Sequence, residues 1–147
     1  MEPIHHFEAP YLFTSNKMLL KPEQVHLWLS TRSHWAIGIK LETVMTAFDH
    51  SYCVGILHGD QQIGYARLIT DYATFGYLAD VFILEEYRGL GLSKKMLTLL
   101  FDLDWVKSLR RIMLATKDAH TLYAPLGFSP PVYPDRIMEI LKLKPYG

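Results

Sequence analysis

The segment from Asp80 to Ser93 constrains the fold more than any other part of the chain. It reads Asp-Val-Phe-Ile-Leu-Glu-Glu-Tyr-Arg-Gly-Leu-Gly-Leu-Ser, so a run of strand-forming residues enters a turn with two glycines, and an amphipathic stretch follows. Glycine permits a positive φ and a close approach of the backbone to a ligand, and the first amides of a helix have no partner within the helix. The pattern predicts a strand, an anion-binding turn and a helix.

Three cationic side chains accompany this turn. Arg88 precedes the first glycine, and Lys94 and Lys95 fall in the first turn of the expected helix, where the helix dipole disfavours positive charge. A polyanionic ligand at the turn would balance these charges. The alternative is a purely architectural turn with solvated lysines, which is the better interpretation of a lone Gly-x-Gly.

The hydrophobic periodicity changes along the chain from helical to strand-like and back. A hairpin signal at His58-Gly-Asp-Gln indicates antiparallel pairing of the first strands, and a right-handed crossover should bring the glycine turn beside the end of a parallel strand. We expect a last strand after the stiff loop from Ser129 to Pro134. The other expected elements are helices at 22–31, 40–48 and 91 to about 105, and strands at 52–58, 62–70, 75–84 and 112–116, the last buried on both faces.

Composition narrows the class of protein. A chain of 147 residues with 50% hydrophobic residues fits one domain over residues 1–147. Fifteen acidic and fifteen basic residues cancel, which argues against nucleic acid or an anionic membrane as a partner. The one cysteine, Cys53, excludes an intrachain disulfide and favours the cytoplasm. No apolar run approaches the ~20 residues of a membrane span, and the seven histidines lack the spacing of metal ligands, so we expect no metal.

Two motifs together resemble a known family. Arg88-Gly-Leu-Gly-Leu-Ser93, preceded by Leu-Ala-Asp-Val-Phe-Ile, resembles the acyl-CoA pyrophosphate loop of the GNAT superfamily of N-acyltransferases. Downstream, Ala119-His-Thr-Leu-Tyr-Ala-Pro-Leu-Gly-Phe128 resembles that family's late helix, with a tyrosine four residues after the alanine. The family often has Gly or Ala at Ser93 and Asn at Thr116, and Pro125 should end the late helix early.

The resemblance implies an α/β (α+β) fold. Its sheet is mixed, mostly antiparallel and flanked by helices, with a central strand-helix-strand unit whose parallel strands splay apart to admit the pantetheine arm of acetyl-CoA. Main-chain groups of the third strand would bind that arm, and the glycine turn would bind the pyrophosphate. The implied cofactor-binding residues are Val81, Phe82, Ile83, Arg88, Gly89, Leu90, Gly91, Leu92, Ser93, Lys94, Thr116 and Ala119.

Acyl transfer from a thioester to an amine needs a proton acceptor for the amine and preferably an acid for the departing thiolate. Tyr123 matches the family's catalytic tyrosine, and a phenol with a pKa of about 10 can protonate a thiolate. Asp80 should alternate with Leu78 and Phe82 on an apolar face beside the acyl site, which suits a general base. The alternatives for Asp80 are an ion pair with Arg67 or a loop cap, with Asp71, Tyr72 or water then serving the amine.

These observations predict an N-acetyltransferase that uses acetyl-CoA and acts on a primary amine of a small molecule or peptide by direct attack. Aromatic side chains of the early elements and the third strand are expected to line the acceptor pocket; we single out Trp35, Tyr72 and Phe75. A non-catalytic acyl-CoA-binding sensor or regulatory module is the alternative. Apolar residues near Val132 and Tyr133 are candidates for a homodimer interface.

Overall fold

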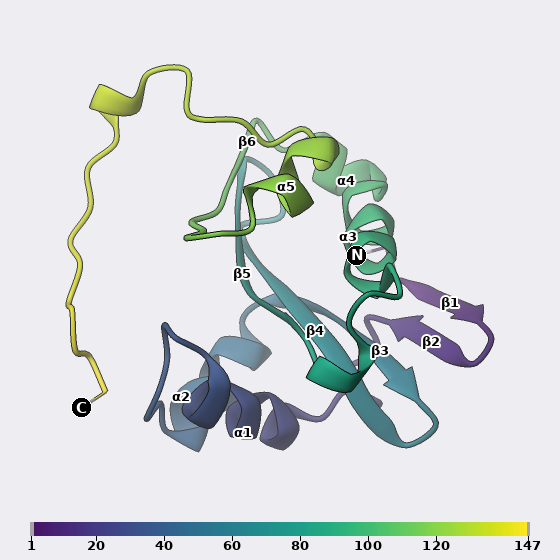
Figure 1. Ribbon diagram of the computed structural model, residues 1–147. Coiled ribbons are helices and arrows are strands. Elements are labelled where there is room, and N and C mark those ends of the chain that lie inside the picture. The colour runs from purple at the N-terminus through teal and green to yellow at the C-terminus, as the bar shows by residue number, and fades with distance from the viewer. Residues whose placement is uncertain (1, 147) are drawn as a thin grey trace.

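A six-stranded sheet forms the centre of the molecule in the computed structural model, which describes residues 2–146 (Figure 1). The strands follow one another across the sheet in chain order, and every neighbouring pair is antiparallel except β5 and β6, which are parallel. The mixed, mostly antiparallel sheet is therefore confirmed. The strands are β1 (His5–Glu8), β2 (Tyr11–Thr14), β3 (Tyr52–His58), β4 (Gln61–Thr70), β5 (Phe75–Ile83) and β6 (Arg111–Met113).

Helices cover both faces of this sheet, with α1 and α2 on one face and α3 and α4 on the other (Figure 1). Within residues 2–146, none of these helices combines the length and the apolar character needed to cross a bilayer. The helices are α1 (Pro22–Arg32), α2 (Leu41–Asp49), α3 (Leu92–Phe101), α4 (Asp104–Lys107) and α5 (His120–Tyr123), with short 3₁₀ turns η1 (Glu85–Tyr87), η2 (Ala124–Leu126) and η3 (Pro134–Arg136).

Each face of the sheet has its own apolar core. Under α3 and α4, Met96, Leu97 and Leu100 are fully buried against the strands. Under α1 and α2, Val25 and the α2 residue Phe48 pack against Cys53, Tyr65 and Phe82. The sheet is thus the middle layer of a helix–sheet–helix arrangement, and α3, which follows the glycine turn, is fixed by its buried stripe.

A bulge in β5 overturns the expected alternation of its side chains. Tyr65 of β4 pairs with Phe82, but Arg67 pairs with Ala79, so β5 has one extra residue in this interval. Asp80 lies in the bulge with a φ of 54°, an uncommon value for a residue other than glycine. Because of the extra residue, Leu78 joins the core under α3 and Phe82 joins the core under α1 and α2. The prediction that Leu78 and Phe82 share a face was wrong.

The two parallel strands separate before β5 reaches the glycine turn. Pairing between β5 and β6 ends at Tyr77 and Met113, while β5 continues to Ile83. In Figure 1 the chain after β6 turns away from β5 toward α5. The splayed parallel strands are confirmed, and the edge of β5 that faces the gap is left without a neighbouring strand.

Several elements differ from their predicted bounds. The helix expected to reach about residue 105 ends at Phe101, because Leu103 adopts an extended conformation before α4 begins. The strand expected at 112–116 spans only Arg111–Met113, and its apolar residues are half-buried where complete burial was expected. The β1–β2 hairpin was not predicted, because its strands have only four residues each and their sequences show no clear alternation of apolar and polar residues.

The chain beyond Phe128 contains no strand in its described part. The prolines of the loop lead into η3, and residues 137–146 then run in an extended path beside the molecule (Figure 1, yellow). The predicted last strand is therefore absent from this arrangement. Its sequence alternates between apolar and charged residues only from Leu141 to Lys144.

Candidate active site

The glycine turn has the backbone conformation that the sequence predicts. Gly89 and Gly91 have φ values of 80° and 76°, and a Cβ added at either position would meet no atom within 4 Å. Gly91 is the N-cap of α3, no side chain caps this helix, and its first turn contains no acidic residue. The first amides of α3 therefore face open space, which suits an anionic ligand.

A cavity of about 600 Å³ lies beside this turn, and we call it the cofactor groove. It runs from the carboxyl end of β5 past the start of α3 to α5. All the predicted cofactor-binding residues line it except Leu90 and Thr116. Leu90 is exposed, with 58% of its surface accessible.

Cationic groups border the cofactor groove. The Nε of Arg88 donates a hydrogen bond of 3.3 Å to the carbonyl of Ile83, which leaves the rest of its guanidinium available. Neither Lys94 nor Lys95 forms an ion pair with any residue between 2 and 146. Arg88 and Lys94 line the groove beside the positive end of the α3 dipole, whereas Lys95 does not line it.

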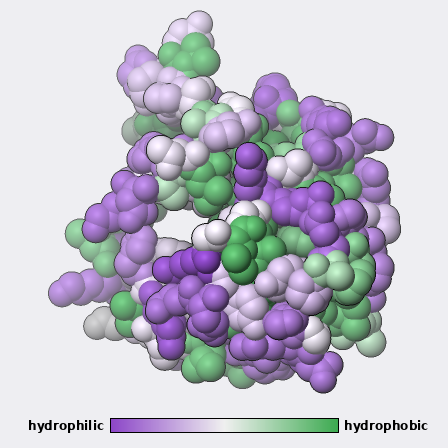
Figure 2. Space-filling view, turned by 45° about the vertical axis from the view of Figure 1, so that its right-hand side comes forward, coloured by the Kyte–Doolittle hydropathy of each residue, from purple (hydrophilic) through white to green (hydrophobic). Residues whose placement is uncertain are grey.

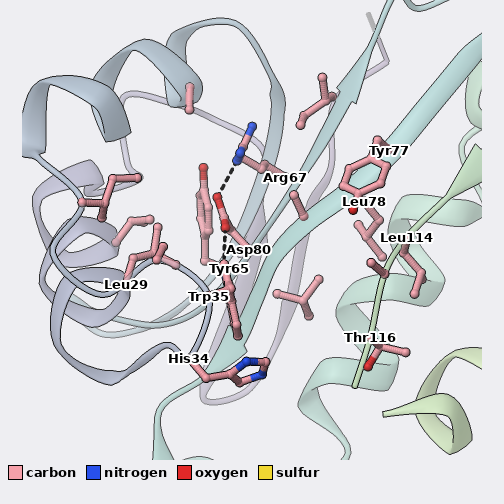
Figure 3. Close-up of a pocket in the computed structure, with 18 of the residues that line it drawn as sticks. Leu29, His34, Trp35, Tyr65, Arg67, Tyr77, Leu78, Asp80, Leu114 and Thr116 are labelled. Atoms are coloured by element: carbon pink, nitrogen blue, oxygen red, sulfur yellow. Dashed lines mark hydrogen bonds and ion pairs between the residues drawn. The ribbon is translucent and has the colours of Figure 1, made fainter. Parts of the chain in front are cut away.

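A second cavity, of about 610 Å³, lies between β4, β5, the α1–α2 region and the segment after β6; we call it the acceptor pocket (Figure 3). Asp80 of the bulge projects into it, and its Oδ2 accepts a 2.6 Å hydrogen bond within an ion pair from Nε of Arg67. Its Oδ1 accepts a 3.0 Å hydrogen bond from Nε1 of Trp35. The carboxylate, 12% exposed, is thus held in one orientation.

The cofactor groove and the acceptor pocket meet. Both are lined by His34, Trp35, Val81, Asp118, Ala119 and Tyr123. Val81 sits in the β5 bulge, and neither Asp80 nor Val81 has a paired residue on β4. A ligand that enters along the cofactor groove would therefore reach the acceptor pocket between the bulge and Tyr123.

Tyr123 is the last residue of α5, because Pro125 ends the helix early as expected. The ring of Phe128 packs against it with 6.0 Å between ring centroids. Burial raises the pKa of the Tyr123 hydroxyl above its ordinary value. The phenol therefore keeps its proton at neutral pH and can act as a donor at the junction of the two cavities.

Thr116, which precedes α5 in the chain, accepts a hydrogen bond from the residue at the start of this helix. Its Oγ1 accepts a 3.0 Å hydrogen bond from the amide of Ala119, the residue that precedes α5. Thr116 also lines the acceptor pocket (Figure 3). Thr116 was predicted to bind the cofactor, but it does not line the cofactor groove, and its hydrogen bond is with the protein backbone.

Comparison with known proteins agrees with this geometry. The sequence pattern of the acetyltransferase (GNAT) family matches residues 22–128. A protein of Gibberella zeae is 31% identical over 142 residues, covering 83% of this chain and 80% of its own length. A crystal structure of a GNAT protein from Xanthomonas campestris pv. campestris is 42% identical, with a TM-score of 0.90, and covers 92% of this chain and 96% of its own. Both relatives are described provisionally as acetyltransferases.

The chain belongs to the GNAT acetyltransferase family.

The structure of this GNAT acetyltransferase brings one of the three predicted acceptor residues to the site. Trp35 lines both cavities, whereas Tyr72 and Phe75 line neither. The ring of Tyr72 packs on Trp105, at 5.1 Å between centroids, in the core under α3 and α4. Phe75 starts β5 at the far end from the bulge, opposite Arg111.

Asp71, the alternative group for the amine, is occupied elsewhere in this GNAT acetyltransferase. Its Oδ1 accepts hydrogen bonds from the amides of Ala73, Thr74 and Phe75, and Oδ2 accepts one from the Thr74 hydroxyl. These hydrogen bonds, led by those from Thr74, hold the pKa of Asp71 well below its ordinary value. Asp71 therefore shapes the loop between β4 and β5.

Cys53 lies in the core outside both cavities, while its partner Tyr65 also lines the acceptor pocket. The Cys53 thiol accepts a 3.1 Å hydrogen bond from the Tyr65 hydroxyl inside the core, and burial raises the pKa of both groups. Over residues 2–146, His, Cys, Asp and Glu side chains form no group of three or more that could hold a metal ion.

Sequence reasoning missed two features of this GNAT site. The first is His34, which lies edge-on to the Trp35 ring at 4.9 Å between centroids and lines both cavities. His34 follows α1 and is far from β5 along the chain, so no local sequence pattern predicts that it lies beside β5. The second is the bulge at Asp80, which depends on the register between β4 and β5.

Proposed function

We propose that this GNAT acetyltransferase transfers the acetyl group of acetyl-CoA to a primary amine by direct attack in a ternary complex. The observation that carries the proposal is the meeting of the cofactor groove and the acceptor pocket at Val81 and Tyr123. An acyl donor in one cavity and an amine in the other would have their reacting atoms at this junction, held close enough to react without a covalent enzyme intermediate.

The cofactor groove suits the shape and charge of acetyl-CoA. The pyrophosphate would lie at the turn, on the amides of Gly91 to Lys94 and near Arg88. The pantetheine arm would follow the unpaired edge of β5 toward Val81. A GNAT-type fold from Clostridium acetobutylicum, 18% identical with a TM-score of 0.61 and covering 89% of this chain and 94% of its own, is described as a predicted acetyltransferase with acetyl-CoA, which supports this choice of donor.

The bulge and Tyr123 would stabilise the two negative charges that develop in the reaction, one on the carbonyl oxygen and one on the departing sulfur. As the amine nitrogen bonds to the thioester carbon, the carbonyl oxygen gains negative charge, and the amide of Val81, which has no partner residue on β4, would donate a hydrogen bond to it. When the carbon–sulfur bond breaks, the electron pair leaves with sulfur, and the Tyr123 hydroxyl would supply a proton to it.

Asp80 would receive the second proton of the amine, directly or through water. Each carboxylate oxygen has two lone pairs, and the hydrogen bonds from Arg67 and Trp35 use one on each oxygen. Asp80→Asn is therefore expected to lower turnover at least tenfold while acetyl-CoA affinity stays unchanged. Steady-state kinetics at saturating acetyl-CoA would test this. If Asp80→Asn has normal turnover, Asp80 is no general base and its role is limited to the ion pair with Arg67.

The acceptor that fits best has an apolar body and a cationic head when free. Trp35 and Tyr77 offer aromatic faces, and Asp80 offers the carboxylate within the same pocket (Figure 3). A small amine, a lysine side chain or a peptide amino group would each satisfy this description, so we propose the primary amine class.

A calorimetric titration with acetyl-CoA tests the premise without the acceptor. We expect micromolar binding that Gly91→Glu abolishes, because a carboxylate and a strained backbone would enter the pyrophosphate site. Gly59→Glu is the matched control: Gly59 also has a positive φ, 61°, and open space around it, but it lies in the β3–β4 turn away from the groove.

The outcomes separate this proposal from its rivals. If both glycine variants still bind acetyl-CoA, the ligand binds elsewhere on the protein. If the folded, unaltered protein does not bind acetyl-CoA, the glycine turn has only a structural role. Binding by the unaltered protein without acetyl transfer to any amine in a broad screen would favour the non-catalytic acyl-CoA sensor.

A further inference from the structure

The side chain of Arg67 has hydrogen-bonding capacity that its ion pair with Asp80 leaves unused. A guanidinium carries five N–H donors. Arg67 donates from Nε to Asp80 at 2.6 Å and from Nη1 to the Ser51 hydroxyl at 3.1 Å. Among residues 2–146, no group accepts a hydrogen bond from its Nη2. Both terminal nitrogens of Arg67 therefore keep free donors.

This free end of the guanidinium is accessible from the acceptor pocket. Arg67 lines the pocket, and 17% of its side-chain surface is accessible. The buried side-chain nitrogens without a hydrogen-bond partner in the described chain are Nε1 of Trp28 and Nε1 of Trp105, so Nη2 of Arg67 is not sealed in the core. A cation with spare donors beside a cavity suits an anionic group, and the planar guanidinium matches a carboxylate in particular.

The charged side chains that line the acceptor pocket balance one another. The basic ones are Arg67 and Lys117, and the acidic ones are Asp80 and Asp118. A ligand with one charge of each sign keeps this balance. A ligand with an ammonium group alone would leave the free donors of Arg67 without a partner wherever it displaced water from them, which costs binding free energy. The pocket therefore suits a zwitterion better than a simple amine.

The positions for the two charges lie next to each other. Asp80 contacts Nε of Arg67, and the free donors belong to the same planar group. An ammonium group on Asp80 and a carboxylate on Arg67 would thus be neighbours, and in an α-amino acid one carbon atom separates these two groups. A lysine side chain has no carboxylate on the carbon beside its amine, and the terminal amine of a peptide has lost that carboxylate to the peptide bond.

Apolar side chains form the walls around these charges. Leu29 of α1 lies on one side of Asp80, and Leu114, which follows β6, lies on the other (Figure 3). Val44 of α2 also lines the pocket. These walls favour an apolar body on the ligand, and the cavity of about 610 Å³ has the size of a small-molecule site.

We propose that the acceptor is a free α-amino acid with an apolar side chain; this narrows the amine class of the proposed function and rests on that function. Asp80 binds the ammonium group, the free donors of Arg67 bind the carboxylate, and the apolar walls contact the side chain.

The transfer balances with these groups. The ammonium first releases one proton to solvent. The neutral nitrogen then bonds to the thioester carbon and gives a second proton to Asp80, while the carbon–sulfur bond breaks and its electron pair leaves with sulfur. Tyr123 protonates the sulfur, and solvent carries the proton of Asp80 back to Tyr123. The products are an N-acetylated amino acid and free coenzyme A.

Matched acceptors test the carboxylate. Leucine is compared with leucinamide, and phenylalanine with phenylalaninamide, by the release of the coenzyme A thiol from acetyl-CoA. We expect kcat/KM to be about 10- to 100-fold higher for each amino acid, because hydrogen bonds from a guanidinium to a carboxylate are among the stronger ones. The amine of an amide is less basic than that of the amino acid, so a larger fraction of it is neutral and amine ionisation alone would favour the amide.

Arg67→Lys tests whether Arg67 is the residue that recognises the carboxylate. Lysine keeps a cation beside Asp80 but lacks the planar group with several donors. The ratio of kcat/KM for leucine to that for leucinamide should fall about tenfold in this variant. Damage to the ion pair or to the fold would slow both acceptors alike and keep the ratio. Asp80→Asn is the control, since it should slow both acceptors and keep the ratio, and circular dichroism verifies that each variant is folded.

The outcomes separate this inference from the proposed function. Transfer to leucinamide as fast as to leucine, or an unchanged ratio in Arg67→Lys, would overturn the recognition of a carboxylate by Arg67 and leave the acetyltransferase proposal intact. Binding of acetyl-CoA without transfer to any amino acid in a full panel would overturn it as well. A calorimetric titration that shows no binding of acetyl-CoA would overturn both.

Discussion

At the scale of single residues, the site is a set of groups whose environments suit different parts of one reaction. Asp80 is fixed by Arg67 and Trp35, while Tyr123 lines both cavities. The role of Tyr123 was assigned from the resemblance of residues 119–128 and stays a prediction. The ion pair of Asp80 was one of two alternatives in the sequence, and the structure contains it.

Tyr123→Phe is expected to reduce kcat about 10- to 100-fold and to leave acetyl-CoA affinity nearly unchanged, since the ring stays and only the proton donor is lost. Because burial raises the pKa of Tyr123 above its ordinary value, its phenol keeps the proton across the whole neutral range. Single-turnover kinetics from pH 6 to 9 would measure the ratio of the rate of the unaltered enzyme to that of Tyr123→Phe.

That ratio should not narrow as the pH rises to 9, because the unaltered enzyme does not lose the proton there. Tyr133→Phe is the matched control: Tyr133 is exposed and stacks on Arg136, and losing its hydroxyl should change nothing. Equal rates for Tyr123→Phe and the unaltered enzyme would remove Tyr123 from the chemistry.

At the scale of elements, α3 and the turn before it were predictable because their signals are local. Two glycines, the first amides of a helix and an apolar stripe all lie within about 15 residues of sequence. The short strands β1 and β2 and the break before α4 were missed, because tertiary packing stabilises these pieces and no strong local periodicity marks them.

The position of α3 depends on its buried stripe, so Met96→Ala should lower the free energy of unfolding by about 2–5 kcal/mol. Met96 is fully buried between α3 and the sheet. Met18→Ala makes the same chemical change at a side chain that is 90% exposed and should cost less than about 0.5 kcal/mol. Urea unfolding at one fixed protein concentration would compare them; equal losses would mean that the α3 stripe does not anchor the helix.

At the scale of the whole molecule, one sheet joins two separate cores, and the candidate active site lies along the part of β5 that the splayed strands leave unpaired. The single domain predicted for residues 1–147 requires these two cores to unfold together. Tryptophans report on both of them, since Trp28 packs in the core under α1 and α2 and Trp105 packs against the core under α3 and α4.

Met96→Ala combined with Val25→Ala therefore tests this cooperativity, because the two residues belong to different cores. Their losses of stability should add within about 0.5 kcal/mol, and fluorescence and circular dichroism should follow one unfolding transition. Two separate transitions in any variant would show that the faces of the sheet unfold independently.

The sequence alone determined the glycine turn, the helix behind it, the order of the central strands and the family. These depend on backbone freedom, helix ends and apolar spacing, all of which adjacent residues encode. Only the tertiary structure decided that Asp80 lies in a bulge beside Arg67 and Trp35, and that the last strand-like segment leaves its own sheet. A bulge arises from the register between two strands, and a free tail reflects which surfaces remain uncovered, so neither is a property of adjacent residues.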